Sequence, residues 1–433
     1  MMINENAGKR VAFLSLGVSV LSVIIYFLVL WLLAKPLISW LVLGKADKNG
    51  LTSAVKFDGD NATYQYMLGR YYHLNLEAPD LDAAVAYYKK SLLLSPLQAG
   101  VWNDLSKVYQ LSGRFDNAEY ALERAVKLNP NDSSLMWQAG TFYLINGMTD
   151  KAVSVLKKYI IIEPDRQIDV YDLCWKLKLD NSYILRNLVP AQYAYQSRYL
   201  KYLIGHKRIE ESDEVWKVID KASVEKVFFV GYVNFLIENG LYGRAGEVWD
   251  EIIDKVPDLK KKAFSLIWNP GFDNEILNGG FDWMISGAEG VDIFVDDSIR
   301  MTGSRSLGVS FDGTHNPDIT VARQVVRVSP GTRYTLKGYI KTDAITTTNG
   351  IFFDVEGHKC EGLNMRSETV TGTNFWRELT VDFAVPSKCN AVVLEIKRER
   401  SNKFDNKIAG SAWIDGLTLK QLTDITKTAS KKP

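Results

Sequence analysis

The sequence is poor in cysteine and histidine and has no excess of either charge. Three cysteines among 433 residues exclude a disulfide-rich scaffold, and four histidines disfavour a histidine-rich metal site. Lysine plus arginine number 52 against 51 for aspartate plus glutamate, so the clustered positive charge of a nucleic-acid binder is not expected. Because 46% of the residues are hydrophobic, the chain can bury large cores. The length fits two to four domains of roughly 100–200 residues.

The sequence also lacks the short motifs that mark common catalytic centres. It contains no phosphate-binding GxxxxGK[ST] loop, no HExxH, no GxSxG and no CxxC. A glycosidase needs two opposed carboxylates, and no spacing singles out such a pair. We therefore expect a protein that is not an enzyme.

One segment near the N-terminus is free of charge. Residues 11–34 contain no charged side chain and are mostly apolar. About 20 such residues span the hydrocarbon core of a bilayer, so they predict a transmembrane helix. Lys9 and Arg10 also fit the basic start of a cleavable signal peptide, but the apolar run exceeds the usual 7–15 residues and no small-x-small cleavage site follows. We predict an uncleaved anchor with a tail at 1–10 and an interfacial segment and linker at 35–60.

A period of 34 residues follows the anchor. It separates Pro96, Pro130 and Pro164, and the alanines 84, 118 and 152 keep the same step. A period of this length predicts stacked helix–turn–helix units. The segment AGVWNDLSKVYQLSGRFDNAEYALERAVKLNP (residues 99–130) resembles a tetratricopeptide repeat. The resemblance implies an all-α solenoid with a concave surface that binds protein or peptide.

Helical patterns continue beyond the third proline. Residues 191–204 pair with 210–221, and residues 228–238 pair with 245–254, which extends the predicted repeat region to 61–266. Family members often place polar groove contacts on the first helix of each repeat. The groove candidates are therefore Asn103, Lys107 and Gln138.

After residue 270 the helical periodicity gives way to short alternating runs bounded by Gly, Asn and Pro. Seven or more strands in about 140 residues predict an antiparallel β-sandwich over 275–421, followed by a disordered basic tail at 422–433. The candidate strands are residues 307–311, 319–328, 334–341, 350–355, 377–385, 391–397 and 412–420.

Five segments of this domain occur in a characteristic order: LNGGFDW, GSRSLGVSF, PGTRYTLKGYIKT, FWRELTVDFAVP and SAWIDGLTL. Together they resemble the galactose-binding-like jelly roll of carbohydrate-binding module families 4, 9 and 22, which implies a sugar-binding sandwich. Sugars stack on aromatic rings beside polar side chains that bond hydroxyl groups. The sugar-binding candidates are Trp283, Tyr339, Phe352, Phe353, Glu356, His358 and Arg398.

The same resemblance implies a structural calcium ion. Relatives often bind it between the first and last strands, where Asp282 and Asp415 stand here. We expect no other cofactor. In an oxidising compartment Cys360 and Cys389 could form a disulfide, whereas Cys174 is expected to be a buried apolar side chain.

A single anchor joined to a sugar-module fold is most sensible in a bacterial inner membrane, with the N-terminus cytoplasmic and the soluble domains periplasmic. The charges flanking the anchor are nearly balanced and do not fix this orientation. We expect a scaffold that binds envelope proteins through its repeats and polysaccharide through its sandwich, in exopolysaccharide or cell-envelope assembly. Two alternatives remain open: a structural assembly protein of a secretion or pilus system whose sandwich binds only protein, and a glycan-processing enzyme.

Overall fold

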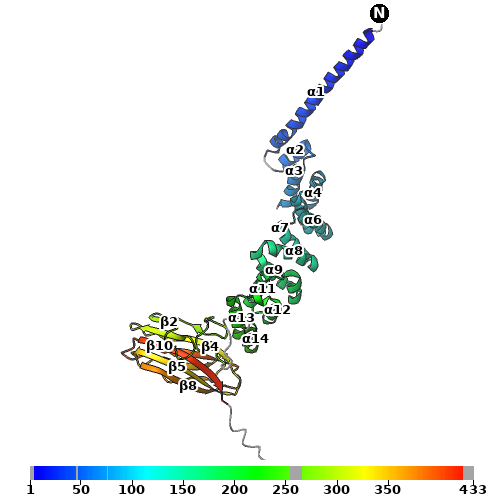
Figure 1. Ribbon diagram of the computed structural model, residues 1–433. Coiled ribbons are helices and arrows are strands. Elements are labelled where there is room, and N and C mark those ends of the chain that lie inside the picture. The colour runs from blue at the N-terminus through cyan, green and yellow to red at the C-terminus, as the bar shows by residue number, and fades with distance from the viewer. Residues whose placement is uncertain (1–3, 45–46, 76, 254–265, 423–433) are drawn as a thin grey trace, which may run out of the picture. The chain divides into compact units, whose positions relative to one another are not determined.

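The computed structural model describes residues 4–44, 47–75, 77–253 and 266–422. It divides into two compact units, 1–190 and 191–433. The first unit contains a long N-terminal helix followed by helix pairs, and the second contains further helix pairs and two β-sheets (Figure 1). The predicted fold class, helical repeats followed by an antiparallel sandwich, is thereby confirmed. The predicted tail at 422–433 lies almost entirely outside the described residues.

The first helix, α1 (Asn4–Leu43), is longer than predicted. It continues through Pro36 instead of ending at Ala34. The proline removes one backbone hydrogen bond from α1, and the helix continues on both sides of it. Residues Val20–Leu41 are apolar enough to cross a membrane, although a signal sequence would meet the same criterion. Large apolar side chains such as Phe27 and Trp31 are exposed on it.

The predicted linker at 35–60 is instead largely helical. Asp47 caps helix α2 (Lys48–Phe57) by accepting a hydrogen bond from the backbone of Gly50. The Phe57 ring lies 5.7 Å from the ring of Trp31, and Lys35 forms a 2.7 Å ion pair with Asp58. The segment after the apolar run is therefore folded back onto α1.

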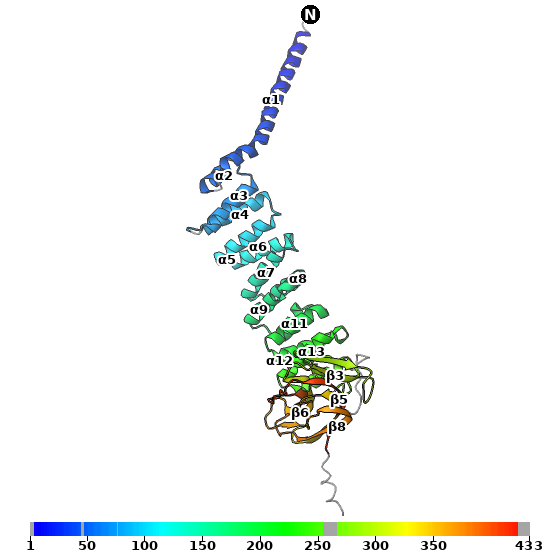
Figure 2. The same ribbon diagram turned by 90° about the vertical axis from the view of Figure 1, so that its left-hand side faces the viewer.

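The 34-residue period corresponds to three antiparallel helix pairs (Figure 2). Small residues let the helices of a pair approach closely: a Cβ on Gly140 would lie 2.4 Å from Leu156, and Ala118 is fully buried. The pairs are α3 (Ala62–Leu74) with α4 (Leu81–Leu94), α5 (Ala99–Leu111) with α6 (Phe115–Leu128), and α7 (Ser133–Ile145) with α8 (Thr149–Ile162).

Helices continue beyond Pro164. A short 3₁₀ turn (Pro164–Arg166) leads into α9 (Gln167–Lys176), α10 (Asn181–Tyr183) and a π-helical turn (Ile184–Leu188). They lie within the predicted helical region 61–266, although the sequence did not locate them individually. The two predicted pairs of the second unit are present, with ends that differ by up to three residues. They are α11 (Tyr193–Gly205) with α12 (Ile209–Val218), and, after a 3₁₀ turn (Lys221–Ser223), α13 (Lys226–Glu238) with α14 (Tyr242–Ile253).

Two five-stranded antiparallel sheets form the sandwich. Sheet A has the order β1 (Met284–Ile285), β4 (Ile319–Arg327), β9 (Ala391–Arg398), β6 (Phe352–Gly357) and β7 (Asn364–Arg366). Sheet B has the order β2 (Val291–Asp296), β3 (Ser306–Asp312), β10 (Ala409–Gln421), β5 (Arg333–Ile345) and β8 (Gly372–Ala384). The seven predicted strands are present, and β1, β2 and β7 are additional.

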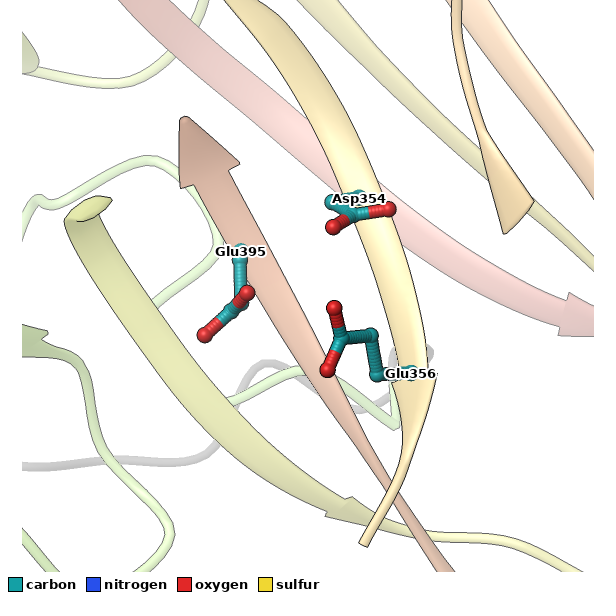
Figure 3. Close-up of side chains that lie close together, drawn as sticks. All are labelled: Asp354, Glu356 and Glu395. Carbon is teal, nitrogen blue, oxygen red and sulfur yellow. The ribbon is translucent and has the colours of Figure 1, made fainter. Parts of the chain in front are cut away.

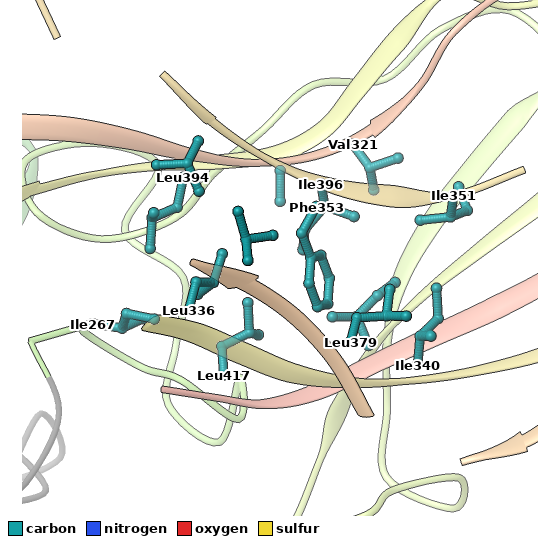
Figure 4. Packing of buried hydrophobic residues seen from close by; sticks show 14 of the residues in the cluster. Ile267, Val321, Leu336, Ile340, Ile351, Phe353, Leu379, Leu394, Ile396 and Leu417 are labelled. Carbon is teal, nitrogen blue, oxygen red and sulfur yellow. The ribbon is translucent and has the colours of Figure 1, made fainter. Parts of the chain in front are cut away.

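The core of the sandwich lies between the sheets. Val321 and Phe353 of sheet A meet Leu336 and Leu379 of sheet B, all at most 1% exposed (Figure 4). Because side chains alternate along a strand, this packing fixes which residues of each strand face outward.

Within the second unit, loops of the sandwich contact the last helix pair. Trp249 packs against Trp268 and Phe281, with ring centroids 5.6 and 5.9 Å away. Gly280 donates its backbone N–H to Asn234 Oδ1 over 2.7 Å, and the Tyr242 hydroxyl lies 2.8 Å from His358 Nδ1. These contacts cover the apolar end that a helical repeat stack would otherwise expose.

Candidate functional site

The outer face of sheet A gathers charged side chains from two neighbouring strands. On β6 the core residues Phe353 and Val355 alternate with Phe352, Asp354 and Glu356, which therefore face outward. The antiparallel register places Asp354 opposite Glu395 of β9 and Phe352 opposite Lys397. The resulting group of Asp354, Glu356, Glu395 and Lys397 is called the Lys397 cluster below.

The carboxylates of this cluster surround one ammonium group. Lys397 Nζ lies 3.0 Å from Asp354 Oδ2, 3.0 Å from Glu395 Oε2 and 3.5 Å from Glu356 Oε1. Burial disfavours the charged lysine, but the hydrogen bonds to Glu395 and Asp354 outweigh it and raise the pKa of the ammonium. The three carboxylates converge from two adjacent strands (Figure 3).

One oxygen of the cluster lacks a partner. The Asp354 side chain is only 6% exposed, and its Oδ1 atom is buried without a hydrogen bond. A buried carboxylate oxygen in this state is rare in folded proteins, and donation from a bound ligand or a water would satisfy it. Glu356, by contrast, is 42% exposed and reaches the surface.

Oxygen ligands in this arrangement also match the preference of a divalent cation. The ammonium of Lys397 already lies within hydrogen-bond distance of two of these carboxylates, so a metal ion would have to displace it. We therefore describe the cluster as carboxylates held in place by a lysine. It carries three negative charges against one positive charge.

Phe352 borders the cluster, but its ring is covered. The guanidinium carbon of Arg366 lies 5.7 Å from the ring centroid, and the side chain of Phe352 is only 3% exposed. Arg366 is held in turn by Glu399, at 3.1 and 3.2 Å from its two carboxylate oxygens. A sugar could stack on Phe352 only if Arg366 moved aside.

The other predicted sugar-binding residues lie apart from this cluster. Trp283 and Phe353 are core residues, and Arg398 is fully buried with hydrogen bonds to Asn316, Asn349 and Asn406. None of these three side chains is accessible to a sugar, because the alternation of the strands and the course of the loops place them in the interior.

Two further candidates reach the surface elsewhere. Tyr339 lies on the outer face of sheet B, where its hydroxyl donates to Glu378 over 3.3 Å. His358 contacts Tyr242, and its pKa is lowered by burial and by the nearby Lys359 and Arg323. Of the seven candidates, Glu356 belongs to the Lys397 cluster and Phe352 borders it.

Asp354, Glu395 and Lys397 were not predicted as site residues. A signal for them exists in the alternation of β6 and β9, where Asp354 and Glu395 each fall between two core positions and Lys397 follows the core residue Ile396. The alternation shows only that these side chains face outward. The register between β6 and β9 is needed to show that they lie next to one another.

The proposed calcium residues are engaged by backbone donors. The two oxygens of Asp415 accept from Met301 N, Thr302 N, Thr302 Oγ1 and Gly416 N at 2.6–3.2 Å. Four donors occupy the lone pairs that a calcium ion would need, so Asp415 does not fit that role as arranged. Asp282 accepts hydrogen bonds from the backbone N–H groups of Leu277 and Trp283. Burial raises the pKa of its carboxyl group more than these hydrogen bonds lower it, to about 7.

The cysteines follow the prediction. Cys360 and Cys389 form a disulfide with a Cα–Cα distance of 5.4 Å, which ties the loop after β6 to the loop before β9. Cys174 is buried in α9, and burial raises the pKa of its thiol to about 12. An unreactive apolar role suits such a thiol.

The predicted groove residues lie on the first helices of the repeats. Asn103 is 8% exposed and its Oδ1 atom is buried without a partner. Lys107 forms a 3.1 Å ion pair with Asp104, which also accepts a 2.8 Å hydrogen bond from Tyr66 of α3. Gln138 bonds within its own helix. The structure thus joins α3 and α5 through Asp104, which sequence reasoning did not single out.

Comparison with known proteins identifies part of the chain. The tetratricopeptide repeat model matches residues 99–132, the segment formed by α5, α6 and the turn that follows. At 27% identity, 111 residues match Superkiller protein 3 of Schizosaccharomyces pombe and 137 residues match the tRNA(Glu)-specific nuclease WapA of Bacillus subtilis subsp. natto. The matches take up 26% and 30% of this chain but only 8% and 6% of those proteins.

Solved structures resemble separate parts of the chain. A crystal structure of MamA matches 27% of the chain at 25% identity and a TM-score of 0.25, over 67% of its own length. TmCBM61 in complex with β-1,4-galactotriose matches 37% of the chain at 15% identity and a TM-score of 0.27, over its whole length. The CBM22-1 xylan-binding domain of Paenibacillus barcinonensis Xyn10C matches 36% at 15% identity and a TM-score of 0.24, over 92% of its length. Independently of these structures, the family match places a tetratricopeptide repeat at residues 99–132.

Proposed function

We propose that this protein is a non-enzymatic, membrane-anchored scaffold whose repeats bind envelope proteins and whose sandwich binds glycan during exopolysaccharide or cell-envelope assembly. The observation that carries the glycan-binding part is the Lys397 cluster. Its polar groups are aimed outward from a rigid sheet, where a chain of sugars could lie across neighbouring strands.

The chemistry of the cluster favours a hydroxyl-rich ligand without acidic groups. Sugar hydroxyls donate hydrogen bonds, and the buried Oδ1 atom of Asp354 lacks a donor. The neighbouring Arg323 and Arg366 offset the cluster's excess of carboxylates only in part, because Arg366 is paired with Glu399. The remaining negative charge would repel uronic acids and sulfated sugars. We therefore propose a neutral or amino-sugar polysaccharide as the ligand class.

The proposed location is the bacterial inner membrane, with the N-terminus cytoplasmic and the soluble domains periplasmic. The apolar stretch of α1 supplies the anchor in this proposal. The disulfide between Cys360 and Cys389 supports an oxidising compartment for the sandwich, because such bonds are rare in the reducing cytosol.

Affinity electrophoresis of the full chain in detergent tests the glycan proposal. Gels containing neutral, amino-sugar or uronic-acid polysaccharides should retard the protein with the first two classes only. Glu356→Gln removes a half-exposed carboxylate of the cluster and should weaken the retardation. Glu378→Gln, a similarly exposed residue on the outer face of sheet B, is the matched control and should leave it unchanged.

The same experiment separates the alternatives. Without retardation by any polysaccharide, the sandwich would instead be assigned a protein-contact role, as in a structural assembly protein. Release of reducing ends from a retarding polysaccharide would point to a glycan-processing enzyme.

A further inference from the structure

A cavity of about 440 Å³ lies between α4, α5 and α6 of the first unit. Its buried walls include Leu92, Leu105 and Tyr109, each at most 6% exposed. At its rim Leu93 is 83% exposed and Tyr120 is 59% exposed. An apolar hollow of this volume lies within the range of ligand pockets and can accept one or two bulky side chains.

Two cations flank the aromatic residues of this cavity. Lys89 Nζ lies 6.0 Å from the centroid of the Tyr109 ring, and the guanidinium carbon of Arg124 lies 5.7 Å from that of Trp102. Within the described residues neither cation has a carboxylate within 4 Å, and the Nε atom of Arg124 is buried without a hydrogen-bond partner. The neighbouring Arg114 differs, because it is paired with Asp82.

The cavity is separate from the predicted peptide groove. Each residue of an α-helix is rotated by about 100° from the previous one, so Lys107 lies on the far side of α5 from Trp102 and Tyr109. Lys107 already has a carboxylate partner in Asp104, whereas among the described residues no carboxylate pairs with Lys89 or Arg124. Lys89 lines the cavity, and Arg124 packs on the lining residue Trp102, so two unpaired cations lie beside it.

We propose that this cavity is a docking site for a peptide segment in which bulky apolar side chains are flanked by aspartate or glutamate. The apolar side chains would fill the space between Leu92 and Trp102, and the carboxylates would pair with Lys89 and Arg124. This inference rests on the proposed role of the repeats in binding protein, and it assigns the partner to a surface other than the groove.

Panning a random twelve-residue peptide phage library on the biotinylated full chain in detergent tests the proposal. The enriched peptides should combine Leu, Phe or Trp with Asp or Glu. The double variant Lys89→Glu, Arg124→Glu should weaken their binding at least about tenfold, because two attractive pairs become repulsive. Lys90→Glu, a neighbouring exposed lysine that does not line the cavity, is the matched charge control and should retain binding.

Four outcomes would overturn the proposal. The enriched peptides could lack acidic residues, or they could bind the double variant as well as the parent. Peptides lost in a Lys107→Glu variant but retained in the double variant would assign binding to the groove, which would leave the proposed function intact. Concentration-dependent dimerisation in analytical ultracentrifugation, abolished by the double variant, would make a second copy of the chain the occupant.

Discussion

Replacing Lys397 with methionine should destabilise the sandwich. The side chain keeps a similar length but loses the charge that the three carboxylates surround at 3.0–3.5 Å. Asp354, Glu356 and Glu395 would then face one another without a counter-ion. Their mutual repulsion in a partly buried site raises the free energy of the folded state.

The size of this loss in stability depends on how exposed Lys397 and its carboxylate partners are. Breaking a buried ion pair costs about 3–5 kcal/mol, whereas an exposed pair is worth at most about 1 kcal/mol. The lysine is 22% exposed and two of its partners are only 6% and 12% exposed. We expect a loss of about 3 kcal/mol near pH 8, which lowers the Tm of a domain of this size by about 10 °C.

Differential scanning calorimetry of the full chain measures this loss. The sandwich transition is the one that dithiothreitol shifts, since the disulfide lies in that domain. Lys337→Met is the matched control: this lysine is paired with Glu378, both side chains are more than a third exposed, and its loss should cost far less than the loss of Lys397. Equal shifts for the two variants would refute the reasoning.

Three further predictions concern the stability of the second unit. Because burial raises the pKa of Asp282 from 3.8 to about 7, the free energy of unfolding should fall by up to about 4 kcal/mol as the pH rises from about 4 to 7, and Asp282→Asn should remove this slope in urea titrations. Replacing Cys360 and Cys389 with alanine should cost about 3 kcal/mol, given their separation of 29 residues, and a calorimetric Tm equal to that of the oxidised parent would contradict this. Gly280→Ala should cost more than about 2 kcal/mol, because φ is +64° and the new Cβ would lie 2.3 Å from an indole carbon of α14, whereas Gly287→Ala meets nothing within 4 Å and should have little effect.

The repeat region could be predicted wherever the 34-residue period holds. The spacing of Pro96, Pro130 and Pro164 located three helix pairs, because each proline stops a helix and each small residue allows close packing. Residues 165–190 were predicted to be helical, but the individual helices there were not located. There the second helix is broken into α10 and a π-helical turn, so no regular period marks it.

In the sandwich, too, the sequence predicted the regular strands but not the short strands or the contacts between strands. Its central strands were predicted from alternation, whereas β1 and β7 are two and three residues long and the charged strand β2 lies at the edge of sheet B. Glu356 was predicted as a site residue, but its association with Glu395 and Lys397 depends on a register that no local pattern gives. Trp283 was predicted as a sugar platform because its residue type cannot reveal that it lies in the core.

Hydrogen exchange of the full chain with a retarding polysaccharide, detected by mass spectrometry, tests the central claim most directly, because it locates the ligand. We predict slower exchange in residues 352–357 and 391–398, the strands that carry the Lys397 cluster, with a smaller effect in Glu356→Gln. Protection limited to sheet B or to the helices, or no protection at saturating polysaccharide, would contradict glycan binding at this face.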